Sequence, residues 1–161
     1  MTSIQTTKFV GYPWLDLFNL VLDVKSYPEF VPRCRAVRVL SRRMTEPGMT
    51  IVVSRMTVGF SVFEVDYANR TIADAIGRQI SIEALDGPLR FLNAAWRFEP
   101  LDEDHTQLYF SVDYEFSNPV LAAVASRVFG AMFGEILNAF ERRAAQLFSD
   151  RNSAAAAHRR R

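Results

Sequence analysis

The sequence has little of the residues that most often carry chemistry. It contains one cysteine, Cys34, and two histidines, His105 and His158, in 161 residues. A single cysteine excludes an intrachain disulfide and gives no sign of an oxidising compartment. Neither histidine has a metal-ligand or nucleophile partner at a recognisable spacing, so metal centres and Cys-His or Ser-His-Asp catalysis are not indicated. We therefore predict a protein that is not an enzyme and has no catalytic residue, metal or cofactor.

Lysine and long apolar runs are scarce as well. Two lysines stand against seventeen arginines, and the formal net charge is only +1, which gives no overall field that would attract DNA. No apolar run reaches the roughly 18 residues of a membrane span. The first ten residues lack the basic and apolar regions of a signal peptide. We expect a soluble, cytoplasmic protein that does not bind DNA and whose contact with the inner face of the cell membrane is at most peripheral.

Apolar residues, by contrast, are plentiful. Hydrophobic residues make up 49% of the chain and aromatic residues 12%, with thirteen phenylalanines. Such a composition excludes a disordered chain, and the length suits one domain. Phenylalanines in this number fill a core or line an apolar pocket, and composition alone leaves both open.

Period-two alternation of apolar and polar residues predicts a series of β-strands. It is clearest over residues 91–99 and 107–116, where every second residue is apolar. A short amphipathic helix is expected over residues 14–22. Further strands are expected over residues 3–10, 36–43, 49–58, 60–72 and 76–85. The turns between successive strands are short, which predicts an antiparallel sheet.

The period changes from 2 to 3.6 after residue 118. Asn118 can cap a helix and Pro119 suits its first position. Residues 120–148 then carry a broad apolar stripe, which predicts one long helix. A sheet with one apolar face must be covered, and this helix is the only predicted element large enough to cover it. We predict an α+β helix-grip fold over residues 1–149, a curved antiparallel sheet wrapped around a long C-terminal helix with short helices after the first strand, and a disordered Ala- and Arg-rich tail over residues 150–161.

Small residues recur along the long helix at Ser126, Gly130 and Gly134. They could leave space between the helix and the sheet for a ligand, or they could allow the two to pack closely. Periodicity does not decide between these interpretations.

Charged residues in the predicted strands have similar alternatives. Five arginines between residues 33 and 43 could dock on anionic lipid or RNA, or could simply protect an edge strand. Glu64 and Asp66 share one strand face and would form an acid pair if that face lined a cavity, whereas such residues more often face water. Arg55, in an otherwise apolar strand, could hold a ligand carbonyl in a pocket, or could extend its charge to solvent.

Three segments of the sequence resemble one known family. Residues 27–34 read YPEFVPRC, residues 85–101 begin LDGPLRFL and continue through WRFEPL, and residues 113–119 with 140–144 supply DYEF, Pro119 and FERRA. This pattern resembles the coenzyme Q-binding branch of the START-like polyketide cyclase superfamily, whose bacterial members are also known as ribosome association toxins. The resemblance covers residues 6–148. It departs at Leu89, where the family commonly has phenylalanine, and this change keeps the apolar character.

The resemblance implies a START-like helix-grip fold with a deep cavity, which would bind ubiquinone or a related polyprenyl lipid. The protein would then act as a non-enzymatic carrier or chaperone for the respiratory chain, with residues 27–32 as a lid. Burial of apolar chain yields about 0.8 kcal/mol per CH₂, so a few isoprene units give useful affinity. Two alternatives stay open: a ribosome-binding regulator that blocks subunit association through the arginine cluster, and a polyketide cyclase-like enzyme. The candidate ligand-binding residues are Tyr27, Phe30, Val31, Arg55, Phe63, Leu92, Trp96, Phe98, Phe110, Tyr114, Phe129, Phe133 and Leu137.

Overall fold

The structure, a computed structural model, describes residues 2–60 and 63–159. Within these ranges the side chains of Phe60, Phe63, Ser126 and residues 150–159 lie outside the described part. The elements in chain order are β1 (Thr2–Val10), α1 (Trp14–Leu22), the 3₁₀ helix η1 (Val24–Glu29), β2 (Cys34–Glu46), β3 (Met49–Phe60), β4 (Phe63–Asp74), β5 (Gln79–Ala84), β6 (Leu89–Pro100), β7 (Thr106–Phe116) and α2 (Pro119–Arg159). Each predicted strand is present, and β5 begins three residues later than expected because Ile76 lies in the preceding turn.

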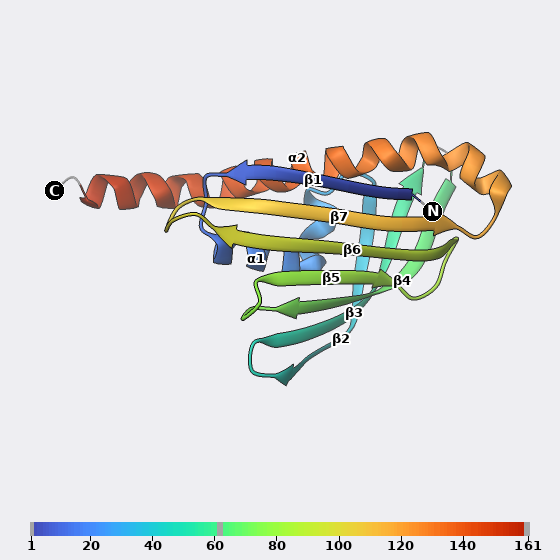
Figure 1. The fold of residues 1–161 in the computed structure, drawn as a ribbon, viewed down its shortest axis with the longest axis horizontal. Helices are drawn as coiled ribbons and strands as arrows, with labels where there is room; N and C mark the ends of the chain where they lie inside the picture. Colours follow the sequence, from blue (N-terminus) through green and yellow to red (C-terminus); the bar gives the residue numbers. More distant parts are fainter. Residues whose placement is uncertain (1, 61–62, 160–161) are drawn as a thin grey trace.

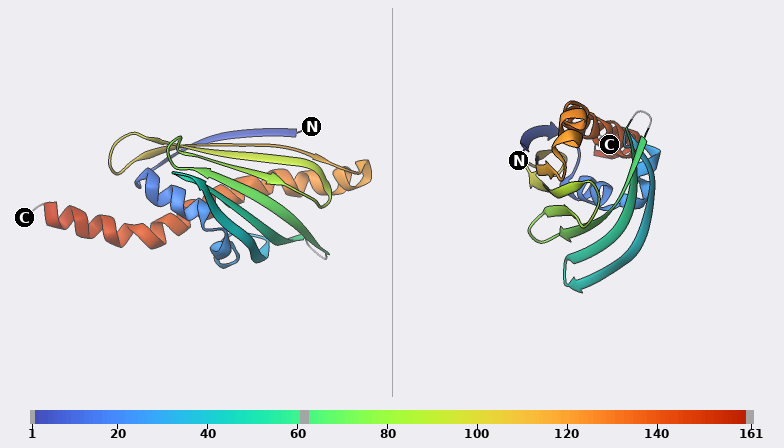
Figure 2. Two further views of the ribbon diagram at one scale, coloured as in Figure 1. Left: turned by 90° about the horizontal axis from the view of Figure 1, so that it is seen from below. Right: turned by 90° about the vertical axis from the view of Figure 1, so that its right-hand side faces the viewer.

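The seven strands form one antiparallel sheet in the order β1-β7-β6-β5-β4-β3-β2. Strands β2 to β7 are connected as consecutive hairpins, while α1 and η1 link β1 at one edge to β2 at the other. Figure 1 shows α2 running along the sheet, and the right-hand view of Figure 2 shows the sheet curling around the helices. The predicted α+β helix-grip fold is confirmed.

The core lies between the concave face of the sheet and the helices. Strands β6 and β7 bury every second residue, as their alternation predicts. The concave face of β6 carries Trp96 and Phe98, which are 3% and 1% exposed, and their partners across to β7 are Phe110 and Leu108. The apolar stripe of α2 packs onto these rings, with Phe140 5.2 Å from Trp96 between ring centroids. Aromatic rings of the sheet and of α2 thus meet in the core.

Helix α2 begins as predicted and extends further than predicted. The side-chain Oδ1 of Asn118 accepts a 2.8 Å hydrogen bond from the Val120 amide, which satisfies one of the free N–H groups of the first turn. The helix continues through residues 150–159, for which the sequence predicts a disordered tail, because the run of four alanines from residue 154 has the highest helix propensity. Its last turns project beyond the sheet in Figure 1.

The long helix is also bent. Its two arms, Pro119–Ala125 and Arg127–Ser149, meet at 51°. No single helix in the described ranges is long and apolar enough to cross a membrane, although the two arms taken together reach that length and composition. The first arm lies near the start of β6 and the end of β7, where Leu121 and Ala125 share one small cavity with Leu89 and Phe116.

Candidate ligand cavity

A cavity of about 120 Å³ lies between α2 and the concave face of the sheet. Its walls come from β2 to β7, from α2, from η1 and from the segment that follows η1. Seven of the thirteen candidate residues line it: Tyr27, Val31, Leu92, Trp96, Phe110, Phe129 and Phe133. The structure therefore brings together candidates from four separate parts of the chain, as a ligand site requires.

Four other candidates pack behind this lining, three of them buried and Phe30 partly buried. Phe30 packs on Phe140, with ring centroids 5.1 Å apart, and Tyr114 packs on Phe129 at 4.7 Å. Phe98 on β6 and Leu137 on α2 lie beside a much smaller space under α1. These four residues position the lining residues and do not line the main cavity. The Phe63 side chain lies outside the described residues.

The placement of Arg55 in the pocket is wrong. In β3 the even-numbered residues Met56 and Val58 line the cavity, so the odd-numbered Arg55 points to the convex face. There its Nε lies 2.5 Å from Asp66 Oδ1 and its guanidinium lies 3.2 Å from Asp86 Oδ2. The hydrogen bonds that Arg55 donates to the carboxylates of Asp66 and Asp86 raise the pKa of Arg55. Arg55 holds the outer face of β3 and β4 to the loop before β6.

Glu64 and Asp66 also face outward. Both side chains are about half exposed; Glu64 lies 2.5 Å from Arg35, and Asp66 is held by Arg55. The acid pair in a cavity is therefore not formed, and the alternative in which these residues face water is correct.

Several lining residues were not among the candidates. They lie mainly on β3, β4 and α2 and comprise Pro32, Cys34, Met56, Val58, Tyr67, Asn69, Ile82, Ala94, Met132, Ile136 and Phe140. In β4 the concave residues Tyr67, Asn69 and Thr71 are partly polar, so a search for apolar alternation passes over them. Residues 67, 69, 71 and 73 are alternate residues of β4 and share one face. This spacing is the sequence signal that assigns Tyr67 and Asn69 to the cavity.

The polar groups of the lining are uncharged. Burial raises the pKa of the Cys34 thiol to about 11. Burial also raises the pKa of Tyr67 to about 12, although a hydrogen bond with the Asn69 side chain opposes the rise. Burial raises the pKa of Tyr27 as well, and its hydroxyl donates to the Val21 carbonyl. At neutral pH the cavity therefore offers a ligand apolar surface and neutral hydrogen-bonding groups.

The small residues of α2 do not create this cavity. A Cβ added at Gly130 or Gly134 would meet no atom within 4 Å outside the neighbouring helix backbone, and Gly134 is exposed. Both glycines lie on the flank of the helix and not against the sheet, so the ligand-space and close-packing interpretations are both wrong for them. The Ser126 side chain lies outside the described residues.

A second, smaller cavity of about 30 Å³ adjoins the first. The two share a wall made of Val58, Tyr67, Phe129 and Met132. The far side of the second cavity is formed by Leu121 and Ala125, on the first arm of α2. The two spaces together follow the helix towards its bend.

The segment after η1 forms one wall of the main cavity. Val31 and Pro32 line it, and the ion pair Arg33–Glu135 at 3.9 Å connects this segment with α2. A second ion pair, Arg143–Glu29 at 3.1 Å, connects the last residue of η1 with α2. The segment predicted to be a lid, residues 27–32, thus lies at the cavity wall, and its opening stays a prediction.

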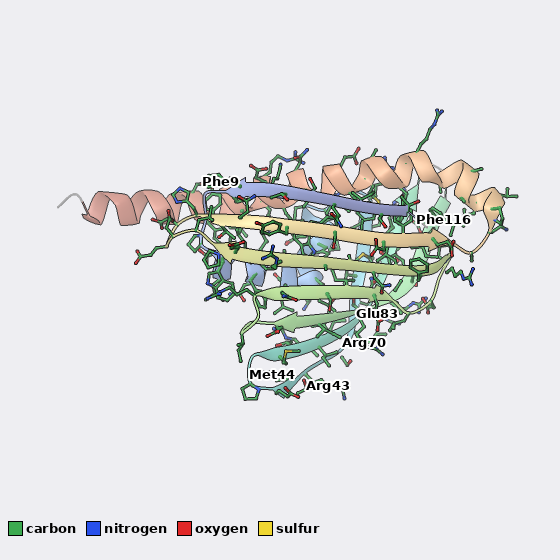
Figure 3. The ribbon with its side chains drawn as sticks, viewed as in Figure 1. Phe9, Arg43, Met44, Arg70, Glu83 and Phe116 are labelled. Atoms are coloured by element: carbon green, nitrogen blue, oxygen red, sulfur yellow. The ribbon has the colours of Figure 1, made fainter. Side chains whose placement is uncertain are left out.

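The arginine cluster divides into two groups. Arg33 and Arg35 pair with Glu135 and Glu64. The remaining arginines, Arg38, Arg42 and Arg43, are exposed on β2, which is an edge of the sheet. Figure 3 shows Arg43 and Met44 at the free end of the β2–β3 hairpin, away from α2.

Comparison with known proteins agrees with this geometry. The family of polyketide cyclase / dehydrase and lipid transport proteins matches residues 10–141. The Ribosome association toxin RatA of Escherichia coli K12 is 32% identical over 94% of this chain and 92% of its own length. The mitochondrial Coenzyme Q-binding protein COQ10 of Dictyostelium discoideum is 24% identical over 92% of this chain and 72% of its own length.

Among solved structures, a START superfamily protein from Mycobacterium smegmatis has a similar fold. Its TM-score is 0.75 at 21% identity, and the match covers 90% of this chain and 98% of the other. At this identity the likeness concerns the fold alone. The family match over residues 10–141 shows that this chain belongs to the polyketide cyclase / dehydrase and lipid transport family.

Proposed function

We propose that this protein binds a lipid with a ring and a polyprenyl chain, ubiquinone or a close relative, and carries it chemically unchanged. The observation that supports the proposal is the apolar cavity under α2, walled by the rings of Trp96, Phe110, Phe129, Phe133 and Phe140. Aromatic walls suit a flat ring, which can pack against them face to edge or with an offset. The name of the COQ10 relative supports the same ligand class.

The size of the cavity bears on how the ligand would sit. About 120 Å³ is below the roughly 300–1,000 Å³ of typical ligand pockets. A ring would therefore occupy the main cavity, and a chain would extend through the shared wall towards the second cavity beside the bend. Entry of a whole lipid requires the helix or the segment after η1 to move.

The lining favours binding over chemistry. Among the described residues that line the main cavity, none is Asp, Glu, His, Lys or Arg. Cyclase chemistry would need an acid or base near the substrate, and Cys34 and Tyr67 keep their protons at neutral pH. This supports a non-enzymatic function over the cyclase alternative.

A matched pair of variants tests the proposal. Ala94 faces the cavity from β6 and is 8% exposed, whereas its neighbour Ala95 is exposed on the convex face. Ala94→Phe places a ring inside the cavity, and Ala95→Phe adds the same ring outside. The experiment is titration with a short-chain ubiquinone, followed by quenching of Trp96 fluorescence, together with mass spectrometry of solvent extracts from purified protein.

We expect the wild type and Ala95→Phe to bind, and Ala94→Phe to lose binding while it keeps its circular dichroism spectrum. Absence of quinone from the extracts and failure of the folded wild type to take up added quinone would overturn the proposal.

A second candidate function is ribosome association. It is favoured by the name of the RatA relative and by the exposed arginines Arg38, Arg42 and Arg43 at the sheet edge. Basic side chains that contact phosphates give binding that weakens steeply with salt. The test is co-sedimentation with ribosomal subunits at low salt. Loss of binding in the Arg38→Glu, Arg42→Glu, Arg43→Glu variant supports this function, provided that the same change at the exposed Arg90, Arg127 and Arg142 has no effect. No co-sedimentation of the wild type would exclude it.

A further inference from the structure

Two buried polar atoms on the concave face of the sheet have no hydrogen-bond partner. They are Ser54 Oγ on β3 and Asn69 Oδ1 on β4, and their residues are 1% and 4% exposed. Nearly all buried polar side-chain atoms in proteins are hydrogen-bonded, so two such atoms in one place call for an explanation.

The two residues are neighbours in the sheet. Ser54 and Asn69 are directly paired across β3 and β4, so their side chains stand side by side on the same face. Asn69 lines the main cavity together with Tyr67 and Cys34. Asn69 Oδ1 therefore lies at the sheet side of an otherwise apolar cavity, and Ser54 Oγ lies beside Asn69 on the same face, next to the lining residues.

The direction of the existing hydrogen bonds shows what kind of partner is missing. The Asn69 side chain lowers the pKa of Tyr67, which is the effect of an amide N–H directed at the Tyr67 oxygen. The Tyr67 hydroxyl has the Met56 sulfur, 3.7 Å away, as its acceptor. What remains free on Asn69 is the carbonyl oxygen, which can only accept.

We propose that Ser54 and Asn69 form a hydrogen-bonding subsite that selects a ligand ring bearing a hydroxyl group, a quinol or a phenol, over the corresponding quinone. The inference rests on the proposed binding of a ring lipid in this cavity. A ring hydroxyl would donate its hydrogen to Asn69 Oδ1, and Ser54 Oγ beside it would share that hydrogen as a second acceptor. A quinone carbonyl has no hydrogen to donate, and it would place its lone pairs against those of Asn69 Oδ1.

The selectivity follows from the cost of an unmade hydrogen bond. A buried acceptor left without a donor keeps its desolvation penalty, and a ligand that supplies the donor removes that penalty. One such hydrogen bond corresponds to about a tenfold difference in affinity.

The experiment compares the reduced and oxidised forms of one ligand. A short-chain ubiquinol, kept reduced under anaerobic conditions, and its quinone are titrated by calorimetry into the wild type, Asn69→Leu, Ser54→Ala and the control Asn93→Leu. Asn93 is exposed on the convex side of β6, so its substitution changes the same residue type outside the cavity.

We expect the wild type and Asn93→Leu to prefer quinol by about tenfold. We expect Asn69→Leu to bind both forms with similar affinity and Ser54→Ala to show a smaller preference. We also expect ligand-free Ser54→Ala to unfold at a higher temperature than the wild type, because the variant lacks a buried hydroxyl that has no partner. This measurement tests the unsatisfied Ser54 hydroxyl even if Asn69→Leu does not fold.

The outcomes separate this inference from the function on which it rests. Equal affinity of the wild type for the two forms, a preference for quinone, or an unchanged preference in Asn69→Leu would overturn the subsite and leave the lipid-binding function standing. Failure of the wild type to bind either form would overturn both.

Discussion

At the scale of single residues, burial sets the charge of the cavity lining. Cys34 and Tyr67 are held in an apolar site, so the folded protein keeps their protons to a pH of about 11 and about 12. In the unfolded chain the same groups ionise near pH 9.0 and 10.0. The folded pKa values are the higher ones, so the stabilising contribution is complete below pH 9 and is lost as pH rises to 11 and 12.

We predict that the free energy of unfolding falls between pH 9 and pH 12, by on the order of 2 kcal/mol for each of the two groups. Urea unfolding at intervals from pH 7 to pH 12 measures this fall. Cys34→Ala should remove the part between pH 9 and 11, and Tyr67→Phe the part between pH 10 and 12. A profile that is the same in both variants as in the wild type would contradict the prediction.

The outward position of Arg55 leads to a second prediction at this scale. Arg55→Gln breaks the contacts with Asp66 and Asp86 on the convex face and leaves the lining of the cavity unchanged. We expect quinone affinity to stay within about twofold of the wild-type value, since about 0.4 kcal/mol separates affinities that differ by this factor. Phe133→Ala, which opens the cavity wall, is the comparison and should weaken binding. A large loss of affinity in Arg55→Gln would contradict the prediction and show that Arg55 contributes to ligand binding.

At the scale of elements, α2 carries two glycines that its packing does not require. Neither Gly130 nor Gly134 has a neighbour that a methyl group would displace. We predict that Gly130→Ala and Gly134→Ala each stabilise the protein by about 1 kcal/mol, because alanine restricts the unfolded chain and favours the helix. Thermal and urea unfolding of the single and double variants measure the gain.

The same substitutions test how the cavity opens. The glycines lie just after the bend at residue 126, so they make the helix easier to deform where it covers the cavity. We expect the double alanine variant to release bound quinone more slowly in stopped-flow exchange. An unchanged release rate would indicate that opening takes place at the segment after η1.

The elements also show how far sequence patterns lead. Strands β6 and β7 alternate clearly because one face meets α2 and the other meets water, and Trp96 and Phe110 could therefore be assigned to the cavity in advance. Strands β3 and β4 carry polar groups on the buried face and apolar groups on the outer face. Asn69 was consequently missed and Arg55 was misplaced, since a one-dimensional pattern does not record which face is covered.

At the scale of the whole molecule, ligand binding and folding stability are linked. A ligand that binds the folded protein alone raises the free energy of unfolding by about 2.7 kcal/mol at a concentration of 100 times the Kd. We predict that added short-chain ubiquinone raises the unfolding temperature of the wild type in a concentration-dependent way. Ala94→Phe should show no rise, and Ala95→Phe should behave as the wild type. A rise of equal size in Ala94→Phe would place the ligand outside the cavity.

The open sheet has a consequence for the range of ligands. Its edge strands β1 and β2 are each paired on one side only. They are not hydrogen-bonded to each other, and the chain connects them through α1 and η1. The sheet can thus uncurl slightly without breaking a backbone hydrogen bond, at the cost of side-chain contacts alone. A closed barrel would fix the maximum size of the ligand, whereas the cavity of this open sheet can widen around a larger ligand. Affinity should therefore decline gradually and not abruptly as the lipid chain lengthens.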